Sequence, residues 1–153
     1  MDLARRTMHG ALGGVGGTLV LTALRKTLAR AGLVHTTAPE QVVARLEEIG
    51  ALEGLSPVAK RALAVSAHLA YGVGSGAAFA LLRRDRGDAK TEAAVGSALG
   101  VLAWGVGWSS WLPLLGVHSP PWTQQTPKVL LPVLDHAVFG AAWGLLYRSL
   151  RQV

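Results

Sequence analysis

The stretch ALAVSAHLAYGVGSGAAFALL, from Ala62 to Leu82, decides the fold of this chain. Its 21 residues include no formally charged side chain. A helix rises by about 1.5 Å per residue, so this length crosses the roughly 30 Å hydrocarbon core of a bilayer. The stretch therefore predicts a membrane-spanning helix.

Composition extends this prediction to the whole chain. Half of the 153 residues are hydrophobic, only 16% are charged, and the mean hydropathy is +0.35. Soluble domains usually carry about 25% charged residues. The pattern predicts a single all-α domain, an integral membrane four-helix bundle with spans near 8–31, 61–83, 93–115 and 129–147. A short amphipathic helix near 39–52, begun by Thr37 and Pro39, is expected to lie at the membrane interface or to cap the bundle.

Polar, small and aromatic residues recur in this stretch at helical spacing, and a near copy follows in the last span. The first set is His68, Tyr71, Gly72, Ser75, Gly76 and Phe79; the second is His136, Phe139, Gly140, Trp143, Gly144 and Tyr147. Steps of three or four place each set on one helix face. The match is compatible with duplication of a two-span hairpin and equally with coincidence among common small and aromatic residues.

The first uncharged run, residues 8–24, follows two arginines and so has the order of a signal peptide. It continues into Leu24-Arg25-Lys26-Thr27-Leu28 with no small-residue cleavage site, which favours a retained span. Arg25 and Lys26 are then expected to extend to the interface. The chain has no cysteine, which excludes disulfides and thiolate metal sites.

Charge sets the expected orientation and the expected partners. The loop after the second span holds Arg83, Arg84, Arg86 and Lys90, which favours a cytoplasmic loop and cytoplasmic termini. The first loop is also basic, and this conflicts with that orientation. The net charge of +6 fits basic span ends better than nucleic-acid binding, because no basic helix face is present. The expected partners are the lipid bilayer and either further copies of this chain or a larger membrane complex.

Glycine pairs spaced four apart are expected to form the contacts between spans. Small residues let helix backbones approach closely where lipid supplies no hydrophobic driving force. The predicted packing pairs are Gly13/Gly17, Gly72/Gly76, Gly96/Gly100 and Gly140/Gly144.

Asp135 is the only acid inside a predicted span. An aspartate at mid-membrane costs about 2.5–3.5 kcal/mol on insertion scales, so it usually faces a partner or water. One hypothesis is a proton or cation relay with His136 or His68. The other is a residue near the outer end of the span, hydrated or bonded to a neighbouring helix.

His68 and His136 occupy corresponding positions in the two copies. If the spans pack together, the imidazoles are candidates for bis-histidine haem ligation, or otherwise for an interhelical hydrogen bond. No metal site is predicted, because no Glu-x-x-His pattern accompanies them.

Trp104, Trp108 and Trp111 share a face of the third span and are candidates to line a ligand or lipid site with Tyr71. Core packing, with Trp111 and Trp122 in the interfacial aromatic belt, is the alternative. The sequence offers no catalytic residue, since no Ser-His-Asp set or paired carboxylates can be recognised.

The chain resembles the YagU-like family of small bacterial inner-membrane proteins. The resemblance lies in ALRKTLARAGL after a glycine-rich span, then PEQVVARL, HLAYGVGSGAAFALL, WGVGWSSWLPLLGV and DHAVFGAAWGLLYR. It implies an inner-membrane helical bundle and no particular reaction or site.

Three functions are open at this point. The first is a non-enzymatic accessory, scaffold or stress-related membrane protein. The second is an oligomeric proton-coupled transporter or permeation unit that uses Asp135. The third is a haem- or quinone-binding redox subunit that uses His68 and His136.

Overall fold

The computed structural model describes residues 2–33, 36–83 and 87–152, and it is all-helical over these ranges. Four helices are long and apolar enough to cross a membrane, as the sequence predicted. Arg84, Asp85 and Arg86 of the basic turn lie outside the described residues. The helices are α1 (Leu3–Arg30), α2 (Ala38–Glu48), α3 (Pro57–Leu82), α4 (Ala89–Ser109), α5 (Trp111–Leu114) and α6 (Thr126–Leu150), with a single 3-10 turn, η1 (Pro121–Thr123).

Local capping explains where several helices begin. Asp2 and Asp88 each accept a hydrogen bond from the backbone N–H three residues later, and the Ser56 hydroxyl caps α3 just before Pro57. The bond from Thr91 lowers the pKa of the Asp88 carboxyl below its ordinary value. This cap therefore stabilises the fold at pH above the ordinary aspartate pKa, and its contribution is lost as pH falls through the lowered value.

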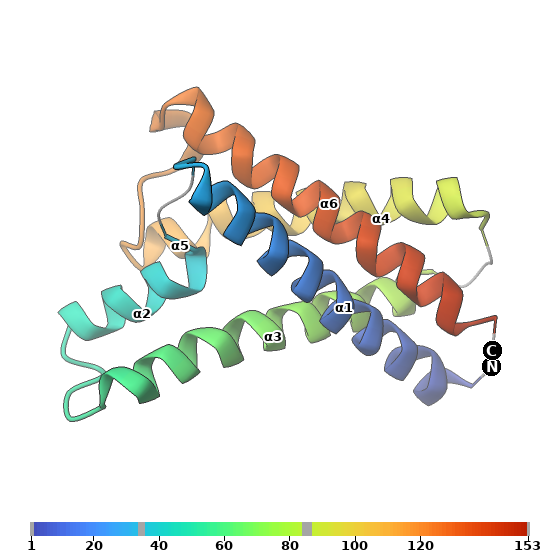
Figure 1. Ribbon diagram of the computed structural model, residues 1–153, viewed down its shortest axis with the longest axis horizontal. Helices are drawn as coiled ribbons and strands as arrows, with labels where there is room; N and C mark the ends of the chain where they lie inside the picture. Colours follow the sequence, from blue (N-terminus) through green and yellow to red (C-terminus); the bar gives the residue numbers. More distant parts are fainter. Residues whose placement is uncertain (1, 34–35, 84–86, 153) are drawn as a thin grey trace.

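The four long helices contact one another in the order α3, α1, α6, α4 (Figure 1). Helix α1 lies between α3 and α6, α4 packs along α6, and α2 packs on α3. Helices α3 and α4 scarcely touch, although a short turn joins them. Both termini lie at one end of the molecule, and α2 and α5 lie at the other.

Glycine allows α1 and α3 to cross with their backbones in contact. A Cβ added at Gly76 would collide with the Gly10 carbonyl oxygen and lie 2.7 Å from the Gly14 nitrogen. Gly72 faces Gly14 and Thr18 in the same crossing. The Gly10 and Gly14 face of α1 was not part of the sequence prediction, whereas Gly13 and Gly17 lie on the side of α1 that faces α6.

An equivalent crossing joins α4 to α6. A Cβ added at Gly140 would collide with the Gly96 carbonyl oxygen, and Gly100 lies against the His136 carbonyl and Gly140. Thus the corresponding glycines of α3 and α6 each meet the preceding long helix of their own hairpin. Gly13 and Gly17 of α1 instead make room for Tyr147 and Phe139, two of the aromatic core rings.

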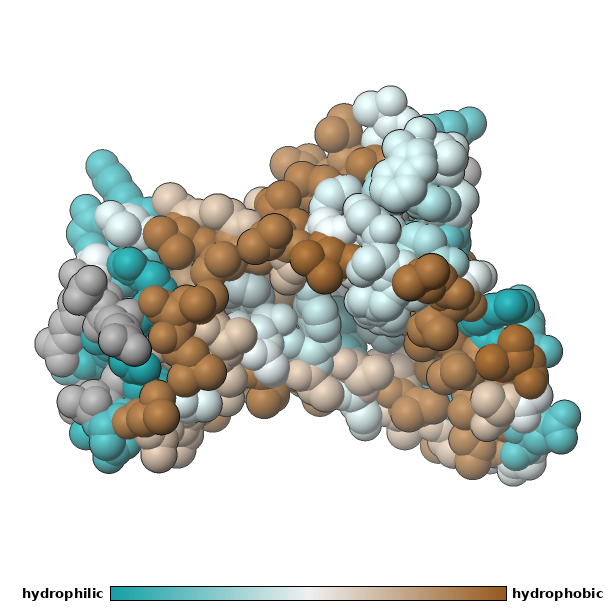
Figure 2. All heavy atoms as spheres, turned by 180° about the vertical axis from the view of Figure 1, so that it is seen from behind, coloured by the Kyte–Doolittle hydropathy of each residue, from teal (hydrophilic) through white to brown (hydrophobic). Residues whose placement is uncertain are grey.

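The core is a small cluster of aromatic rings with Leu21 and Ala80. Phe139 and Trp143 meet edge to face at 4.5 Å, and Phe79 and Tyr147 do so at 5.5 Å. The outer surface between the two ends is mostly apolar, and polar residues gather toward the ends (Figure 2). This distribution suits a molecule whose middle faces lipid.

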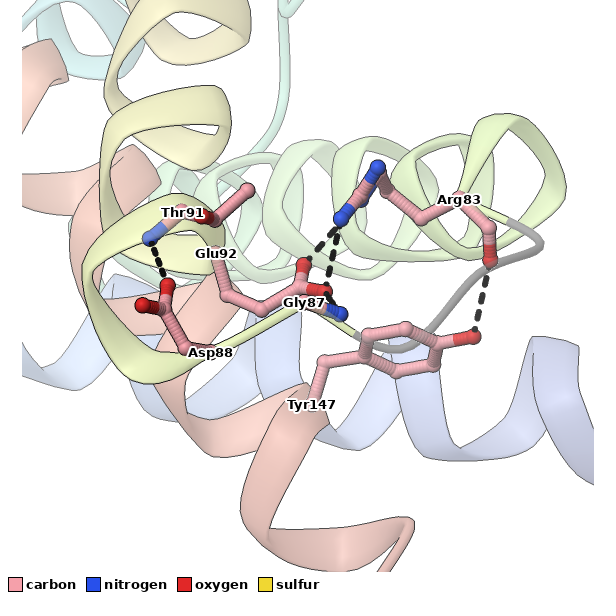
Figure 3. A network of polar contacts seen from close by, with 6 residues as sticks. All are labelled: Arg83, Gly87, Asp88, Thr91, Glu92 and Tyr147. Atoms are coloured by element: carbon pink, nitrogen blue, oxygen red, sulfur yellow. Dashed lines mark hydrogen bonds and ion pairs between the residues drawn. The ribbon is translucent and has the colours of Figure 1, made fainter.

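A buried carboxylate fastens the turn between α3 and α4 (Figure 3). Glu92 is 1% exposed, and its two oxygens accept hydrogen bonds from Arg83 at 2.9 and 3.2 Å and from the Gly87 N–H at 2.8 Å. The Tyr147 hydroxyl lies 3.5 Å from the Arg83 carbonyl oxygen, to which it donates. The bidentate pair holds the two helix ends together where few apolar contacts do so.

Glu92→Gln is expected to destabilise the protein by about 1.5–3 kcal/mol, because the amide keeps the shape but removes the charge that Arg83 binds. The free energy of unfolding, measured in mixed micelles of rising dodecyl sulfate fraction, checks this. Glu53→Gln, at an exposed position, is the matched control and should unfold with the parent. Equal stability of all three proteins would contradict the assigned role of Glu92.

Candidate functional site

A cavity of about 140 Å³ lies between the helices at the end opposite the termini. We call it the aromatic chamber. Its walls come from α1, α3, α4, α5 and α6, and the first turns of α2 with Thr37 lie over it. The lining includes six of the candidate residues named from the sequence: His68, Tyr71, Trp104, Trp108, Trp111 and His136.

The two sequence copies meet at this chamber. His68 and Tyr71 come from α3, and His136 and Phe139 come from the same positions of α6. The Tyr71 ring lies 6.4 Å from that of His136, edge to face, and 6.1 Å from that of Phe139, stacked. The three-residue step within each copy places its histidine and its aromatic ring on one face, so both pairs reach the same cavity.

His136 has a defined tautomer. Its Nδ1 lies 2.8 Å from the Pro132 carbonyl oxygen. A carbonyl oxygen only accepts, so Nδ1 carries the proton and Nε2 keeps its lone pair. Helix α6 continues through Pro132 without interruption, and the acceptor is the Pro132 carbonyl oxygen, one turn before His136.

Two indole nitrogens of the chamber lack partners. Trp104 Nε1 and Trp108 Nε1 are buried and have no hydrogen-bond acceptor among the described residues. The Trp108 ring lies 6.1 Å from that of Trp104 and 4.2 Å from that of His118. A buried donor without an acceptor costs about 1–3 kcal/mol, so a ligand oxygen at this wall would offset that cost.

Asp135 lies beside the aromatic chamber and forms an ion pair with Arg25 of α1 at 2.8 Å. The two side chains are 2% and 10% exposed. The expectation that Arg25 extends to the interface is therefore wrong: it turns inward, because a buried carboxylate is available across the helix contact. Neither histidine is the ion-pair partner of Asp135.

A second cavity, of about 720 Å³, adjoins the aromatic chamber, and we call it the polar vestibule. Arg25 and Trp108 line both cavities, and Asp135 lines only the vestibule. Its other walls carry hydroxyl, amide and imidazole groups, including Thr36, Gln41, Ser119, Thr123, Gln124 and His118. The ion pair thus stands at the boundary between a polar and an apolar space.

Helix α2 is held over the chamber by two polar contacts that the sequence did not reveal. Arg45 donates to the Leu115 carbonyl oxygen at 3.1 Å, after α5, and Glu47 forms an ion pair with Lys60 of α3. The Glu40 carboxylate accepts from the Thr37 N–H at 2.7 Å and fixes the first turn. Helix α2 therefore caps the bundle over the chamber, which is one of the two placements expected from the sequence.

The chamber suits a ring-sized molecule and not a haem. A cavity of about 150 Å³ holds benzene, and the chamber is of similar size, so a four-pyrrole macrocycle would require the helices to separate. The part of the chain that the structure describes has no cluster of three metal-binding side chains. The structure places both histidines, His68 and His136, in the wall of this chamber.

The position of Arg25 in the wall of the chamber could have been predicted in part from the sequence. Thr18, Leu21 and Arg25 are spaced at three and four residues and all line the chamber, so they mark a face of α1. Nothing in that spacing identifies Asp135 as the partner.

Comparison with known protein families, characterised proteins and solved structures gives no match.

Proposed function

We propose that this protein is a multi-pass, non-enzymatic protein of the bacterial inner membrane that binds a small lipid-soluble molecule in the aromatic chamber. The observation that carries the proposal is the convergence on one cavity of both histidine–aromatic pairs and of two tryptophans whose indole N–H groups have no acceptor among the described residues. Binding sites for small molecules combine apolar and aromatic walls with a few directed polar groups in this way.

The chamber favours an uncharged ring that carries oxygen acceptors, as in quinones. Trp104 and Trp108 line the chamber and their indole N–H groups have no acceptor among the described residues, so we propose that they donate to such oxygens; Tyr71, which carries a hydroxyl, also lines the wall. The only formal charge in the lining is Arg25, which Asp135 neutralises. A charged ligand would therefore lose its hydration without gaining a counter-charge.

The residues that line the chamber fit an accessory or scaffold protein with a bound ligand better than they fit a proton relay. A relay through Asp135 would have to break its ion pair and leave the Arg25 guanidinium buried without compensation. The YagU-like resemblance agrees with an inner-membrane protein of this kind. We further propose that the glycine crossings hold the spans together and that the protein works as a homo-oligomer or within a larger membrane complex.

The orientation follows from the basic turn after the second span. With both termini in the cytoplasm, the end that carries α2, α5 and the vestibule lies on the outer side of the membrane.

Duroquinone, a single fully substituted ring with two carbonyl oxygens, is the test ligand. At about 100 times its dissociation constant a ligand adds roughly 2.7 kcal/mol to stability, which should raise the melting temperature by about 5 °C or more. Circular dichroism of the detergent-solubilised protein measures the shift. The chain has no cysteine with which a quinone can react.

Two tryptophan variants localise the effect. Trp104→Leu, in the chamber, should lose the shift, and Trp122→Leu, at a 72% exposed position outside it, should keep it. No shift in the parent, or the same shift in both variants, would contradict the proposed function.

A further inference from the structure

An apolar groove leads from the aromatic chamber along the outside of the molecule between α3 and α4. This lateral groove has a volume of about 340 Å³ and shares Tyr71, Ala103, Gly107 and Trp111 with the chamber. It continues past Ser75 and Phe79 to Leu82 on α3. From Tyr71 to Leu82 a helix rises about 16 Å, so the groove runs through much of one bilayer half.

The glycine crossings explain why this groove exists. Glycines of α3 face α1, and glycines of α4 face α6, so neither helix turns its small-residue face toward the other. The two helices scarcely touch, and side chains of both line the space between them. The lining includes no charged residue, and Leu82, Leu102 and Val106 are more than half exposed.

The three cavities adjoin one another, and one of them is polar while the other two are largely apolar. The polar vestibule joins the aromatic chamber at Arg25 and Trp108, and the chamber joins the lateral groove at Tyr71, Ala103, Gly107 and Trp111. A molecule that fits all three has a polar edge, a ring and an apolar chain. Its chain would remain in contact with lipid, where it costs no transfer into water.

We propose that the ligand is a ring-headed lipid with one long apolar chain, such as an alkyl or isoprenoid quinone, and that it enters from the bilayer through the lateral groove. This rests on the proposed function and specifies its ligand. The neutralised Arg25–Asp135 pair and the unpartnered indole N–H groups of Trp104 and Trp108 favour an uncharged head with acceptor oxygens over a phosphate head. One groove, open along one side, holds one chain.

The test compares duroquinone with a benzoquinone that carries one decyl chain, in phosphatidylcholine nanodiscs, with affinities corrected for partition into lipid. The parent should prefer the decyl compound by at least tenfold. Ala78→Leu places a larger side chain in the groove, at a position that does not line the chamber, and should abolish the preference while duroquinone still binds. Ala70→Leu is the matched control, because Ala70 is exposed on the same helix and lines neither the chamber nor the groove, and it should keep the preference.

A second measurement does not depend on either variant. A decylquinone with a photoreactive diazirine at the chain end should label residues 75–82 of α3 or 99–106 of α4 in the unaltered protein. Labels on α1 or the far side of α6 would overturn the proposal. The proposal would also be overturned if two-chain phospholipid displaced the photoreactive probe as easily as decylquinone does. It would be overturned, too, if the groove stayed unlabelled in a protein whose mass shows that it is a dimer.

The outcomes separate the two proposals. Binding of duroquinone without preference for the chain overturns the groove and leaves the chamber. Binding of neither quinone overturns both.

Discussion

Gly76→Ala is expected to destabilise the protein by about 1–3 kcal/mol, the usual cost of forcing extra atoms into a packed contact. The added methyl collides with the Gly10 carbonyl oxygen and lies 2.7–2.8 Å from Gly14 backbone atoms. These are backbone atoms, which have no rotamer to change, so α1 and α3 must separate. Unfolding in mixed micelles of rising dodecyl sulfate fraction measures the loss.

Gly74→Ala is the matched control two residues away on the same helix. A Cβ there meets nothing within 4 Å. The substitution should leave stability unchanged or raise it by up to about 1 kcal/mol, because alanine favours the helix over glycine. The two variants thus have expected effects of opposite sign, and Gly76→Ala with the stability of the parent would contradict the proposed crossing. Gly76→Leu should lower the stability further than Gly76→Ala does.

Asp135→Asn is expected to have the larger effect, about 3 kcal/mol or more. It leaves the Arg25 guanidinium, 10% exposed, without the carboxylate now 2.8 Å away. Removing one partner of a buried pair typically costs about 3–5 kcal/mol, because the remaining charge stays desolvated. The same unfolding assay gives the change, and Arg30→Gln, at the exposed end of α1, should behave as the parent does.

The double variant Arg25→Met, Asp135→Leu removes both members of the ion pair. It therefore distinguishes the effect of losing the pair from the effect of leaving one buried charge without its partner. Apolar replacement of both members of a buried ion pair is often neutral or stabilising. The double variant should therefore recover most of the stability that Asp135→Asn loses. A double variant at least as unstable as the two single changes combined would show that the pair is not an isolated unit.

The all-helical class and the four apolar helices were predictable because each depends on local composition and on length. The shared faces were predictable for the same reason: a step of three or four residues fixes which side chains of one helix lie together. His68 with Tyr71, and His136 with Phe139, are examples, and each pair lines the chamber.

The partners of those faces were not predictable, because partner choice depends on contacts between distant segments. Gly13 and Gly17 are one of two glycine faces on α1, and nothing in the spacing says that Gly10 and Gly14 face α3. Asp135 had several histidines and basic residues as possible neighbours, and the helix order selected Arg25. The position of α2 over the chamber likewise depends on Arg45 reaching the end of α5.

Native mass spectrometry of the unaltered protein, purified from bacterial membranes in a mild detergent, tests ligand binding by the chamber most directly. We expect one small lipid-soluble molecule per chain, retained in Trp122→Leu and lost in Trp104→Leu. A protein that carries only ordinary phospholipid in variable amounts, the same in both variants, would contradict the account. The histidines and tryptophans of the chamber would then be packing residues.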